Sequence, residues 1–593
     1  MKYTEKLSAI RDQMQQNGID AYVIPSSDPH ISEYLPDHFK CIEWTSGFSG
    51  SAGTLVITAD FAGLWTDARY FVQAADQLKD SGFELVKLRV QATPEYVEWL
   101  TERLPKGSTV AFDGRLVAAE LVKTMRAGFN RFGFKLDTKS DLLGPIWVNR
   151  PPFLRNPVFT LPVSTTGEST ADKIKRLRAE MKKQQVDFHL ISSMDDTAWL
   201  LNVRGSDVEC NPLVLSHTLV SQTEVIWFVD FSRIDNATKD ELEKAEITLK
   251  PYEAFVDAVQ ELPEGKSVLV DAKKICQLVY ESIPAEVNIV EGTNPTTLFK
   301  TIKNTVEQEH IRQTMVKDGV AMVKFLKWLE ENIGKTYIDE LTASAKLYDF
   351  RAEQEGFVGE SFGTISAYRG HAALPHYRST EESNVELKAE GIYLVDSGGQ
   401  YHTGTTDITR TLTLGKPTDE EKKDYTLVLK GMIDLSLIRF PEGTKGYQMD
   451  AYSRKWLWQA GYNFGHGTGH GVGFFLNVHE GPQNISVSGA INVAFQPGML
   501  NSNEPGIYRP EKHGIRIENL VLCQEDVKTE FGQFYKFETV TICPIDKNLI
   551  VKEMLDETQL NWFNNYHQFV YDKLSPNLNT EEQSWLKEKT KAL

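Results

Sequence analysis

The sequence predicts a mixed α/β and α+β protein, in which two tandem related N-terminal α/β domains precede a third domain of different texture. A segment near the N-terminus recurs later in the chain, and a proline-rich stretch separates the two copies. The last part of the chain instead shows strand-like alternation and is dense in glycine, histidine and acidic residues. A chain of 593 residues is also too long for one hydrophobic core.

The internal repeat aligns EKLSAIRDQMQQNGIDAYVIPSSD, residues 5–28, with DKIKRLRAEMKKQQVDFHLISSMD, residues 172–195, without gaps. Each copy begins as an amphipathic helix and continues into a short apolar strand, at residues 21–24 and 188–191. A helix followed by a strand and a polar turn is typical of the opening of an α/β domain. We therefore expect the first two domains to share one fold.

Breaks in these patterns indicate the domain boundaries. Regular structure is interrupted between the two copies by Pro151, Pro152, Pro157 and Pro162. Strand-like runs at 224–231 and 267–270 belong to the second domain, and a new helical pattern begins after about Lys303. Past Asp546 the chain becomes helical again, and its apolar side chains are expected to pack on the third domain or on a partner subunit. The predicted domains are residues 1–158, 159–303 and 304–593.

The composition argues against several classes of function. A formal net charge of -18 opposes binding to phosphate backbones and to anionic membrane surfaces. The five cysteines are odd in number and lack C-x-x-C spacing, which favours reduced thiols over a disulfide framework. Charges interrupt the N-terminal apolar residues, unlike a signal peptide, and no apolar run approaches membrane-spanning length. We expect a cytoplasmic protein that binds neither nucleic acid nor membranes.

The strongest local feature is GIYLVDSGGQYHTGTTDITRTLTLG, residues 391–415, which predicts two strands joined by a glycine-containing turn. Asp396 ends the apolar run 392–395, and Asp407 is expected on the second strand. A buried carboxylate is costly unless it is paired or coordinates a metal, so something cationic should face these residues. A buried Asp–Arg pair that uses Arg410 is the alternative explanation for one of them.

Two histidines lie four apart in HGTGHGVG, residues 466–473. The glycines disfavour a helix, so we expect an extended segment that presents His466 and His470 on one face. A single histidine is more often a core or surface residue than a ligand. Two in this glycine-rich setting, followed by His479 in NVHEGP, favour contact with a metal or a substrate.

Two glutamates complete the set of candidate ligands. Glu504, in NEPG, precedes a proline and is expected at the end of a strand. Glu518, in GIRIENL, alternates with isoleucines and is expected on the polar face of a strand. Either glutamate alone is better explained as a solvated side chain.

Four carboxylates and one imidazole provide enough ligands for two divalent cations. Without cations, carboxylates brought together would have to protonate, whereas two dications cancel about four negative charges. Oxygen-rich ligation without cysteine favours Mn²⁺, with Co²⁺ or Zn²⁺ as alternatives. The candidate metal ligands are Asp396, Asp407, His470, Glu504 and Glu518.

These blocks together resemble the pita-bread metallopeptidases, and their pattern is identified as that of the aminopeptidase P family. The five candidate ligands occur in the family order Asp, Asp, His, Glu, Glu. Two related N-terminal domains before a pita-bread (creatinase/aminopeptidase) catalytic domain are similar to the long, three-domain cytosolic form. Further similarity lies in TDARY, residues 66–70, and in WFNNYH, residues 562–567.

The resemblance implies an aminopeptidase that hydrolyses the N-terminal Xaa-Pro bond of peptides and releases the first residue. It implies that Asp396 holds one metal, that His470 and Glu504 help to hold the other, and that Asp407 and Glu518 bridge both. A water or hydroxide between the two ions would be the nucleophile, because the cations lower its pKa. Glu504 would shuttle protons.

The resemblance also assigns three histidines and an assembly. His376, in LPHY, and His479 match family histidines near the scissile bond, as catalytic and substrate-binding residues, and His466 matches one beside the proline pocket. Because an Xaa-Pro bond lacks the N–H that many peptidases bind, the site must recognise the ring itself. The family implies a homodimer, and the first two domains are assigned to gating, substrate-size selection or dimer contact.

Rival interpretations remain at this point. A prolidase shares the catalytic fold but cleaves Xaa-Pro dipeptides, and the second N-terminal domain argues against it. Creatinase-like hydrolases lack this metal set, and an inactive peptide-binding module is disfavoured by the intact ligands. Asp67 and Arg69 in WTDARY are expected to form an ordinary ion pair rather than to face the active site.

Overall fold

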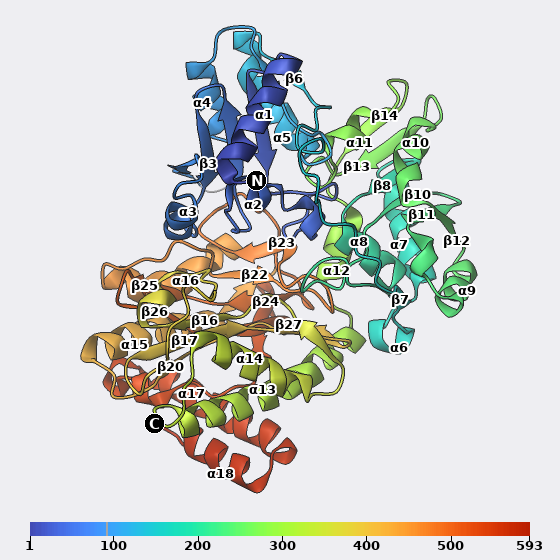
Figure 1. Cartoon of the computed structure of the whole chain (residues 1–593). Helices are drawn as coiled ribbons and strands as arrows, with labels where there is room; N and C mark the ends of the chain where they lie inside the picture. The colour runs from blue at the N-terminus through green and yellow to red at the C-terminus, as the bar shows by residue number, and fades with distance from the viewer. Residues whose placement is uncertain (91–92) are drawn as a thin grey trace. The chain divides into compact units, whose positions relative to one another are not determined.

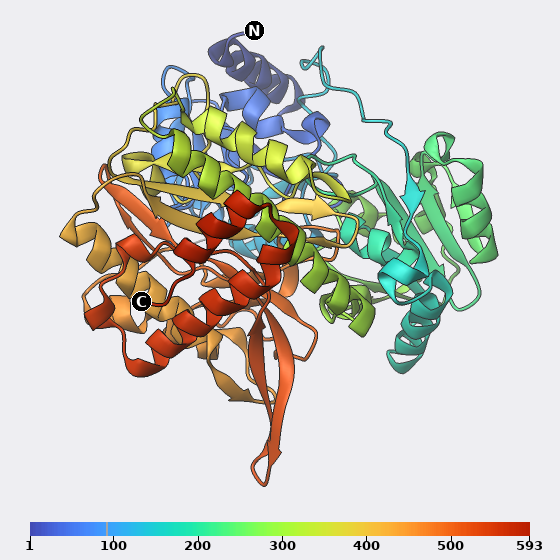
Figure 2. The ribbon, with the colours of Figure 1, turned by 90° about the horizontal axis from the view of Figure 1, so that it is seen from below.

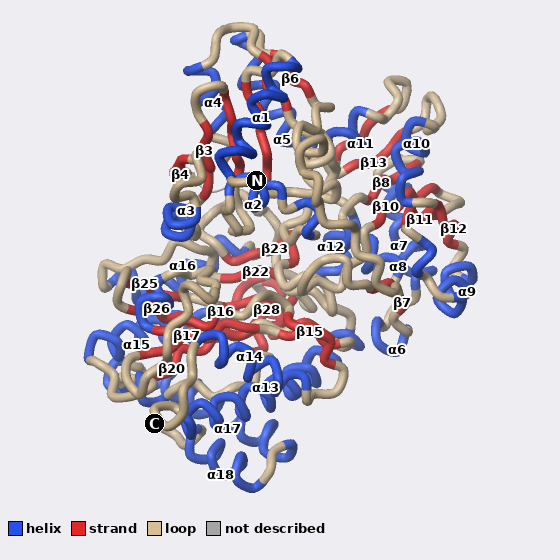
Figure 3. Tube along the Cα trace, in the orientation of Figure 1, coloured by secondary structure: helices blue, strands red, loops and turns tan. Residues whose placement is uncertain are grey.

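The computed structural model describes residues 1–90 and 93–593, which divide into two compact units (Figure 1). The first unit is Met1–Pro162 with Glu168–Thr296, and the second is Val163–Gly167 with Thr297–Leu593. Strands and helices alternate along most of the first unit, whereas the strands of the second unit gather between its helices (Figure 3). Across residues 1–90 and 93–593, no helix combines the length and apolar character needed to cross a membrane.

The first unit contains two six-stranded sheets of identical design. The first sheet has the order β4 (Glu84–Lys87), β3 (Ala62–Thr66), β2 (Thr54–Thr58), β1 (Ala21–Pro25), β5 (Thr109–Ala111) and β6 (Lys135–Asp137). The second has the order β12 (Ile247–Lys250), β11 (Val225–Val229), β10 (Ser216–Ser221), β8 (Phe188–Ile191), β13 (Ser267–Val270) and β14 (Asn288–Glu291). In each sheet the third strand pairs antiparallel with both neighbours, and the other pairings are parallel.

The matching sheets confirm the tandem α/β fold that the sequence repeat predicts. Helix α1 (Tyr3–Asn17) leads into β1, and α7 (Thr170–Lys183) leads into β8. Apolar side chains at helical spacing bury one face of each helix: Leu7, Ile10 and Met14 in α1, and Ile174, Leu177 and Met181 in α7. Burial of this stripe against the sheet stabilises each helix more than its intrinsic propensity does.

Shorter helices complete the two α/β layers. In the first half they are α2 (Cys41–Ser46), α3 (Phe71–Gln77), α4 (Tyr96–Arg103) and α5 (Ala119–Phe129). In the second half they are α8 (Met194–Leu201), α9 (Asn236–Lys244), α10 (Phe255–Gln260) and α11 (Gln277–Glu281). A short strand pair joins β7 (Phe159–Thr160) to β9 (Val203–Arg204). Strand β7 lies within the proline-rich stretch that the sequence analysis predicts to be a linker.

Apart from the C-terminal helices, the second unit places four long helices around antiparallel sheets. The helices are α13 (Thr305–Asn332), α14 (Glu340–Ala352), α15 (Asp419–Ser436) and α16 (Gly446–Gln459). The largest sheet has the order β21 (Arg439–Pro441), β28 (Gly532–Thr539), β27 (Asn519–Thr529), β24 (Leu500–Asn503), β22 (Gly469–Gly471) and β23 (Glu480–Ile485). A three-stranded sheet joins β16 (Ile365–Tyr368), β17 (Ile392–Ser397) and β20 (Ile408–Thr413), and β25 (Gly506–Arg509) pairs with β26 (His513–Arg516).

The predicted hairpin at residues 391–415 is more elaborate than two strands and a turn. Strands β17 and β20 pair antiparallel, with Asp396 opposite Thr409. The segment between them forms β18 (Gly399–Tyr401) and β19 (Gly404–Thr405), which join β15 (Phe357–Glu360) in a sheet of their own. The extra pairing satisfies backbone groups of a buried connection, which a simple turn would leave without partners.

The C-terminal helices pack on the second unit, which is one of the two expected arrangements. Phe563, Val570 and Leu574 of α17 (Glu557–Leu574) share a core with Ile311 of α13. The last helix is α18 (Thr580–Lys589), which follows α17 at the red end of the colour scale in Figure 2. The same view shows β27 and β28 continuing past the sheet as a long ribbon (Figure 2).

Candidate metal centre

Five element ends in the second unit carry the five predicted ligands. Asp396 lies near the end of β17, and Asp407 directly precedes β20. His470 is in β22, an extended segment as the glycines predict, and Glu504 follows β24. Glu518 does not lie on a strand face as expected but in the short link between β26 and β27, where it is 2% exposed. A strand interior would leave this carboxylate on the sheet surface, whereas the link turns it into the core.

The structure brings three of these residues within direct reach of one another. Asp407, His470 and Glu518 each offer one ligand atom, and these atoms lie within 4.8 Å of each other. His470 Nε2 is 3.4 Å from Asp407 Oδ2 and 3.6 Å from Glu504 Oε1. Thr409 donates to Glu518 Oε2 at 2.7 Å, which holds that carboxylate in place.

The backbone fixes the orientation of His470. Its Nδ1 lies 2.9 Å from the carbonyl oxygen of Gly471, which can only accept, so Nδ1 carries the proton. Its backbone N–H donates to Ser502 Oγ at 2.9 Å. Nε2 is therefore the ring nitrogen that faces the carboxylates, and after loss of its proton it would offer its lone pair to a metal, which is the arrangement that protein metal sites use.

Asp396 is held by an arginine that sequence reasoning did not assign to the site. Arg516 is 3% exposed and its Nη2 donates to Asp396 Oδ2 at 2.5 Å. The same guanidinium donates from Nη1 to Tyr508 Oη at 2.7 Å. Asp396 Oδ1 is buried without a hydrogen-bond partner in the described part of the chain. One oxygen of this carboxylate is thus fixed, and the other is directed at the site without a donor.

Burial and mutual repulsion shift the titration of the cluster. Burial, countered in part by Arg516, raises the pKa of Asp396 above its ordinary value. Burial also raises the pKa of Glu504, although His470 opposes the rise, and burial with the nearby carboxylates raises the pKa of Glu518 well above its usual range. Burial disfavours the imidazolium of His470, but Asp407 and Glu504 outweigh it and raise that pKa to about 9. The protein alone therefore leaves the cluster short of positive charge.

The donor set fits a pair of divalent cations. Four carboxylates and one imidazole converge in a buried site, and an acidic oxygen of Asp396 lacks a donor in the described chain. Two dications would bring the local charge close to neutrality and would satisfy that oxygen. Carboxylate oxygens with a single histidine suit Mn²⁺ and similar ions, and thiolates do not take part.

His466 lies beside the cluster and contacts a tyrosine that the sequence analysis did not single out. Its Nε2 is 2.7 Å from Tyr508 Oη, and its Nδ1 is 4.0 Å from Glu504 Oε2. Tyr508 links His466 to Arg516, so a hydrogen-bonded chain runs from this histidine to Asp396. Tyr508 follows Glu504 by four residues, and Arg516 precedes Glu518 by two. This closeness to candidate ligands is the sequence signal that could have identified both residues as part of the site.

The other two predicted histidines occupy different surroundings. The His479 ring lies 4.3 Å from that of His470, with the ring planes at 71°. His376 lies in the loop before β17, between two anchored residues. The Pro375 carbonyl accepts from Arg516 at 3.4 Å, and Tyr377 Oη donates to Glu340 Oε2 at 2.8 Å.

Two ion-pair expectations are resolved by the structure. Arg410 does not pair with an aspartate: it is fully buried and donates to the carbonyls of Thr409, Glu518, Cys543 and Pro544. The arginine that pairs with a site aspartate is Arg516 instead. Asp67 and Arg69 form a two-point ion pair with both contacts at 2.8 Å, as expected.

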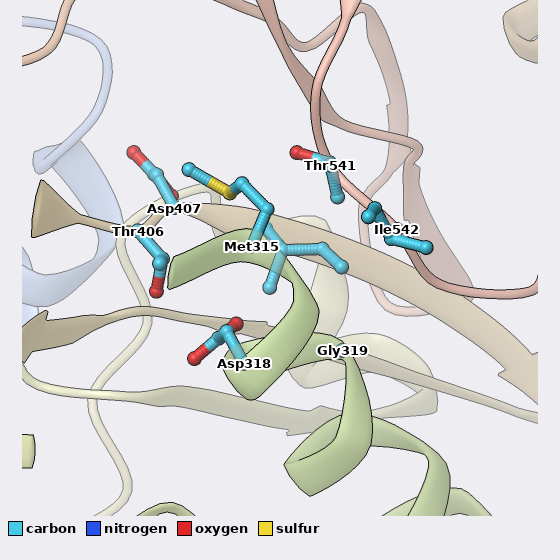
Figure 4. A pocket seen from close by; sticks show the side chains of 8 residues that line it. Met315, Asp318, Gly319, Thr406, Asp407, Thr541 and Ile542 are labelled. Carbon is cyan, nitrogen blue, oxygen red and sulfur yellow. The ribbon is translucent and has the colours of Figure 1, made fainter. Parts of the chain in front are cut away.

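Helix α13 supports the segment that carries Asp407. Met315, Asp318 and Gly319 of this helix line a small recess with Thr406 and Asp407, and Thr541 and Ile542 complete it (Figure 4). Asp318 accepts from Arg351 Nε at 2.8 Å and from Tyr401 Oη at 3.0 Å. The back of the site therefore rests on a helix that is itself anchored by a buried ion pair.

Profiles of known families match nearly the whole chain. The creatinase/prolidase N-terminal domain matches residues 6–136, and a second profile of the same description matches residues 149–307. Metallopeptidase family M24 matches residues 309–525, and the C-terminal region of the M24 peptidases matches residues 533–593. The M24 match contains all five candidate ligands.

Individual relatives match over most or all of their length. A probable Xaa-Pro aminopeptidase P of Laccaria bicolor is 40% identical over 98% of this chain and 92% of its own. The human Xaa-Pro aminopeptidase 2 is 38% identical over 100% of this chain and 89% of its own. Among solved structures, an X-prolyl aminopeptidase from Caenorhabditis elegans, a cytosolic enzyme with a di-nuclear active site, has a TM-score of 0.96 at 34% identity and covers both chains completely. An Xaa-Pro dipeptidase from Bacillus anthracis covers 64% of this chain at 22% identity, with a TM-score of 0.52.

Proposed function

The chain belongs to metallopeptidase family M24, and on this premise we propose that it is an Xaa-Pro aminopeptidase, which hydrolyses the first peptide bond of peptides with proline in second position. The observation that carries the proposal is similarity to Xaa-Pro aminopeptidases along the entire chain, including both N-terminal domains. The dipeptidase from Bacillus anthracis matches only 64% of this chain, although 99% of its own length is covered, and at 22% identity the match shows a common fold and nothing further.

The proposed metal ligands are the five residues gathered at the ends of the strands. Asp396 would hold one ion, His470 and Glu504 would help to hold the other, and Asp407 and Glu518 would bridge them. Two bound divalent ions supply Lewis acidity toward the scissile carbonyl and lower the pKa of water at the site. Mn²⁺ is the proposed metal, and Co²⁺ or Zn²⁺ are alternatives, because the donors are mostly carboxylate oxygens.

Glu504 is proposed to move the proton between the attacking water and the departing proline. The nitrogen of an Xaa-Pro bond carries no hydrogen, so it must gain a proton to leave as a secondary amine. A carboxyl whose pKa burial has raised is suited to take a proton and return it near neutral pH. Arg516 holds one oxygen of Asp396, which orients that carboxylate and favours its ionised form.

Three histidines are proposed to bind the substrate around the reacting bond. His376 and His479 would contact the peptide at the scissile carbonyl and stabilise the charge that develops on its oxygen. His466, fixed by Tyr508, would line the pocket for the proline ring. Because the substrate offers no N–H at this bond, recognition depends on contact with the ring.

The remaining proposals concern organisation. We propose the three domains at residues 1–158, 159–303 and 304–593, and a cytoplasmic homodimer. The first two domains would control access or substrate size, since their described residues include no metal-ligand cluster.

Hydrolysis of a tripeptide and a dipeptide tests the function directly. Chelator-treated protein is assayed with Arg-Pro-Pro and with an Xaa-Pro dipeptide, with and without added Mn²⁺. We expect added Mn²⁺ to restore release of the first residue of the tripeptide, with little cleavage of the dipeptide. Preference for the dipeptide would identify a prolidase, and inactivity toward both would leave a peptide-binding module.

A further inference from the structure

Helix α16 carries a buried ion pair directly beneath the segment that contains His466. Arg454 Nε donates to Asp450 Oδ2 at 2.6 Å across one helical turn, and both side chains are at most 2% exposed. The helix is itself closely packed: a Cβ added at Gly431 of α15 would lie 2.1 Å from the Ser453 carbonyl oxygen of α16. The pair is therefore mounted on a fixed support.

The guanidinium of Arg454 directs its remaining donors at one short stretch of chain, residues 463–466. Nη1 donates to the Phe464 carbonyl and Nη2 to the His466 carbonyl, each at 2.7 Å. The charge also lies 3.7 Å from the centre of the Phe464 ring. The backbone is thus held on both sides of Gly465, at Phe464 and at His466 itself.

The partner carboxylate holds the other side of the same segment. Thr468 Oγ1 donates to Asp450 Oδ1 at 2.7 Å, and the Thr468 carbonyl accepts from the Glu504 N–H at 2.8 Å. One ion pair therefore clamps the backbone before and after His466. It also links that clamp to the strand end that carries Glu504.

A buried charge of this kind is costly unless its hydrogen bonds are satisfied, and here the segment around His466 satisfies them. The planar fork of arginine reaches two carbonyls and a carboxylate at once, which a lysine ammonium cannot do with the same geometry. The segment contains Gly465 and Gly467, whose backbone has little intrinsic preference for one conformation. The clamp supplies the rigidity that the glycines do not.

We propose that Arg454, oriented by Asp450, is a positioning residue that sets selectivity for proline by fixing His466 beside Tyr508 and Glu504. The inference rests on the proposed function, because it assumes that His466 lines the proline pocket. Arg454 itself does not touch the substrate. Its contribution is to hold the imidazole of His466 in place, because a displacement of roughly 1 Å in such a site can lower the reaction rate by up to about a hundredfold.

The test compares Arg454→Lys with the unaltered holoenzyme on Arg-Pro-Pro and Arg-Ala-Pro. We expect KM for Arg-Pro-Pro to rise about tenfold with a smaller fall in kcat, and the preference for proline over alanine to narrow by a similar factor. Metal content should not change. Arg233→Lys is the matched control, because the Arg233 side chain is only 6% exposed and pairs with the buried Asp207 in the first unit, which does not contain the metal centre; its KM should stay near normal.

A double variant separates positioning from general destabilisation. In the His466→Ala background, Arg454→Lys should raise KM little further, whereas an independent effect of full size would overturn the proposal. If Arg454→Lys does not fold, Thr468→Val removes the contact on the other side and should shift KM in the same direction. If an active Arg454→Lys variant has normal KM and normal preference for proline, the positioning role of Arg454 is rejected and the proposed function stands. If the unaltered enzyme does not cleave Xaa-Pro bonds, the proposed function itself is rejected.

Discussion

A buried ion pair of the first unit and the metal centre of the second unit treat buried carboxylates in opposite ways. In the first unit, Asp207 is completely buried, forms a two-point ion pair with Arg233, and accepts from the Leu215 N–H at 2.7 Å. In the second unit, four carboxylates gather at one place, where Arg516 pairs with Asp396 and the imidazole of His470 lies within 3.6 Å of Asp407 and Glu504.

This difference separates structural charge from charge available for chemistry. One guanidinium per carboxylate neutralises the pair and makes it part of the fold. An excess of carboxylates is instead a site that is poised for cations, and it lowers stability until they bind. The raised pKa values of Asp396, Glu504 and Glu518 are the electrostatic sign of that excess.

The largest expected effect belongs to the proton-carrying carboxylate. Glu504→Gln keeps the shape of the side chain but removes its ability to take a proton, so kcat should fall by at least about a thousandfold. Circular dichroism and thermal unfolding should show an intact fold. Glu538→Gln, at a partly exposed ion pair with Arg312, is the control and should be nearly normal. Near-normal turnover in Glu504→Gln would remove this residue from the mechanism.

The next effect tests the proposed bridge between the metals. Asp407→Asn should lose metal together with activity, as measured by elemental analysis of the folded protein. In the metal-free state the same change removes one of four crowded carboxylates. The free energy of unfolding of the metal-free variant should therefore be higher than that of the unaltered protein, by on the order of 1 kcal/mol. Two ions per chain in the purified variant would contradict the bridging role.

The mirror experiment belongs to the first unit. Asp207→Asn leaves the Arg233 guanidinium buried without a charged partner, which should cost about 3–5 kcal/mol of unfolding free energy. Metal content and kcat should stay normal, because Asp207 and Arg233 neutralise each other within the fold of the first unit and are not among the proposed metal ligands. Urea unfolding and metal analysis of one preparation measure both quantities. A loss of metal would show that the division between structural and functional carboxylates does not hold.

The sequence predicts the element types of both units better than it predicts their connections. The repeat signals two copies of one fold because its helix and strand periodicities are long and local. The link that carries Glu518 was misassigned, since the alternation of Ile515 and Ile517 continues past the end of β26. Local periodicity does not report where the partner strand stops.

The site shows the same limit. Acidic residues and histidines in glycine-rich motifs stand out in the sequence. Arg516 and Tyr508 have only their closeness in the chain to Glu518 and Glu504 as a signal, until the fold brings them against Asp396 and His466. Arg454 is further still from the motifs, on a helix whose sequence looks ordinary. Residues that orient others act through contacts distant in the chain, so only three-dimensional structure identifies them.

The smallest expected effect concerns acid stability of the first unit. His189 is buried in β8, and burial lowers its pKa to about 4 although Asp196 opposes the shift. A pKa below the unfolded value means that the folded form binds fewer protons, so stability is present above about pH 6.5 and is lost as the pH falls toward 4. At pH 5 the loss should be about 2 kcal/mol from this residue. Urea unfolding at pH 7 and pH 5 should show this difference, and in His189→Gln the difference should shrink. An undiminished acid slope in that variant would assign the sensitivity to other groups, of which the stacked pair His30 and His217 is the next to substitute.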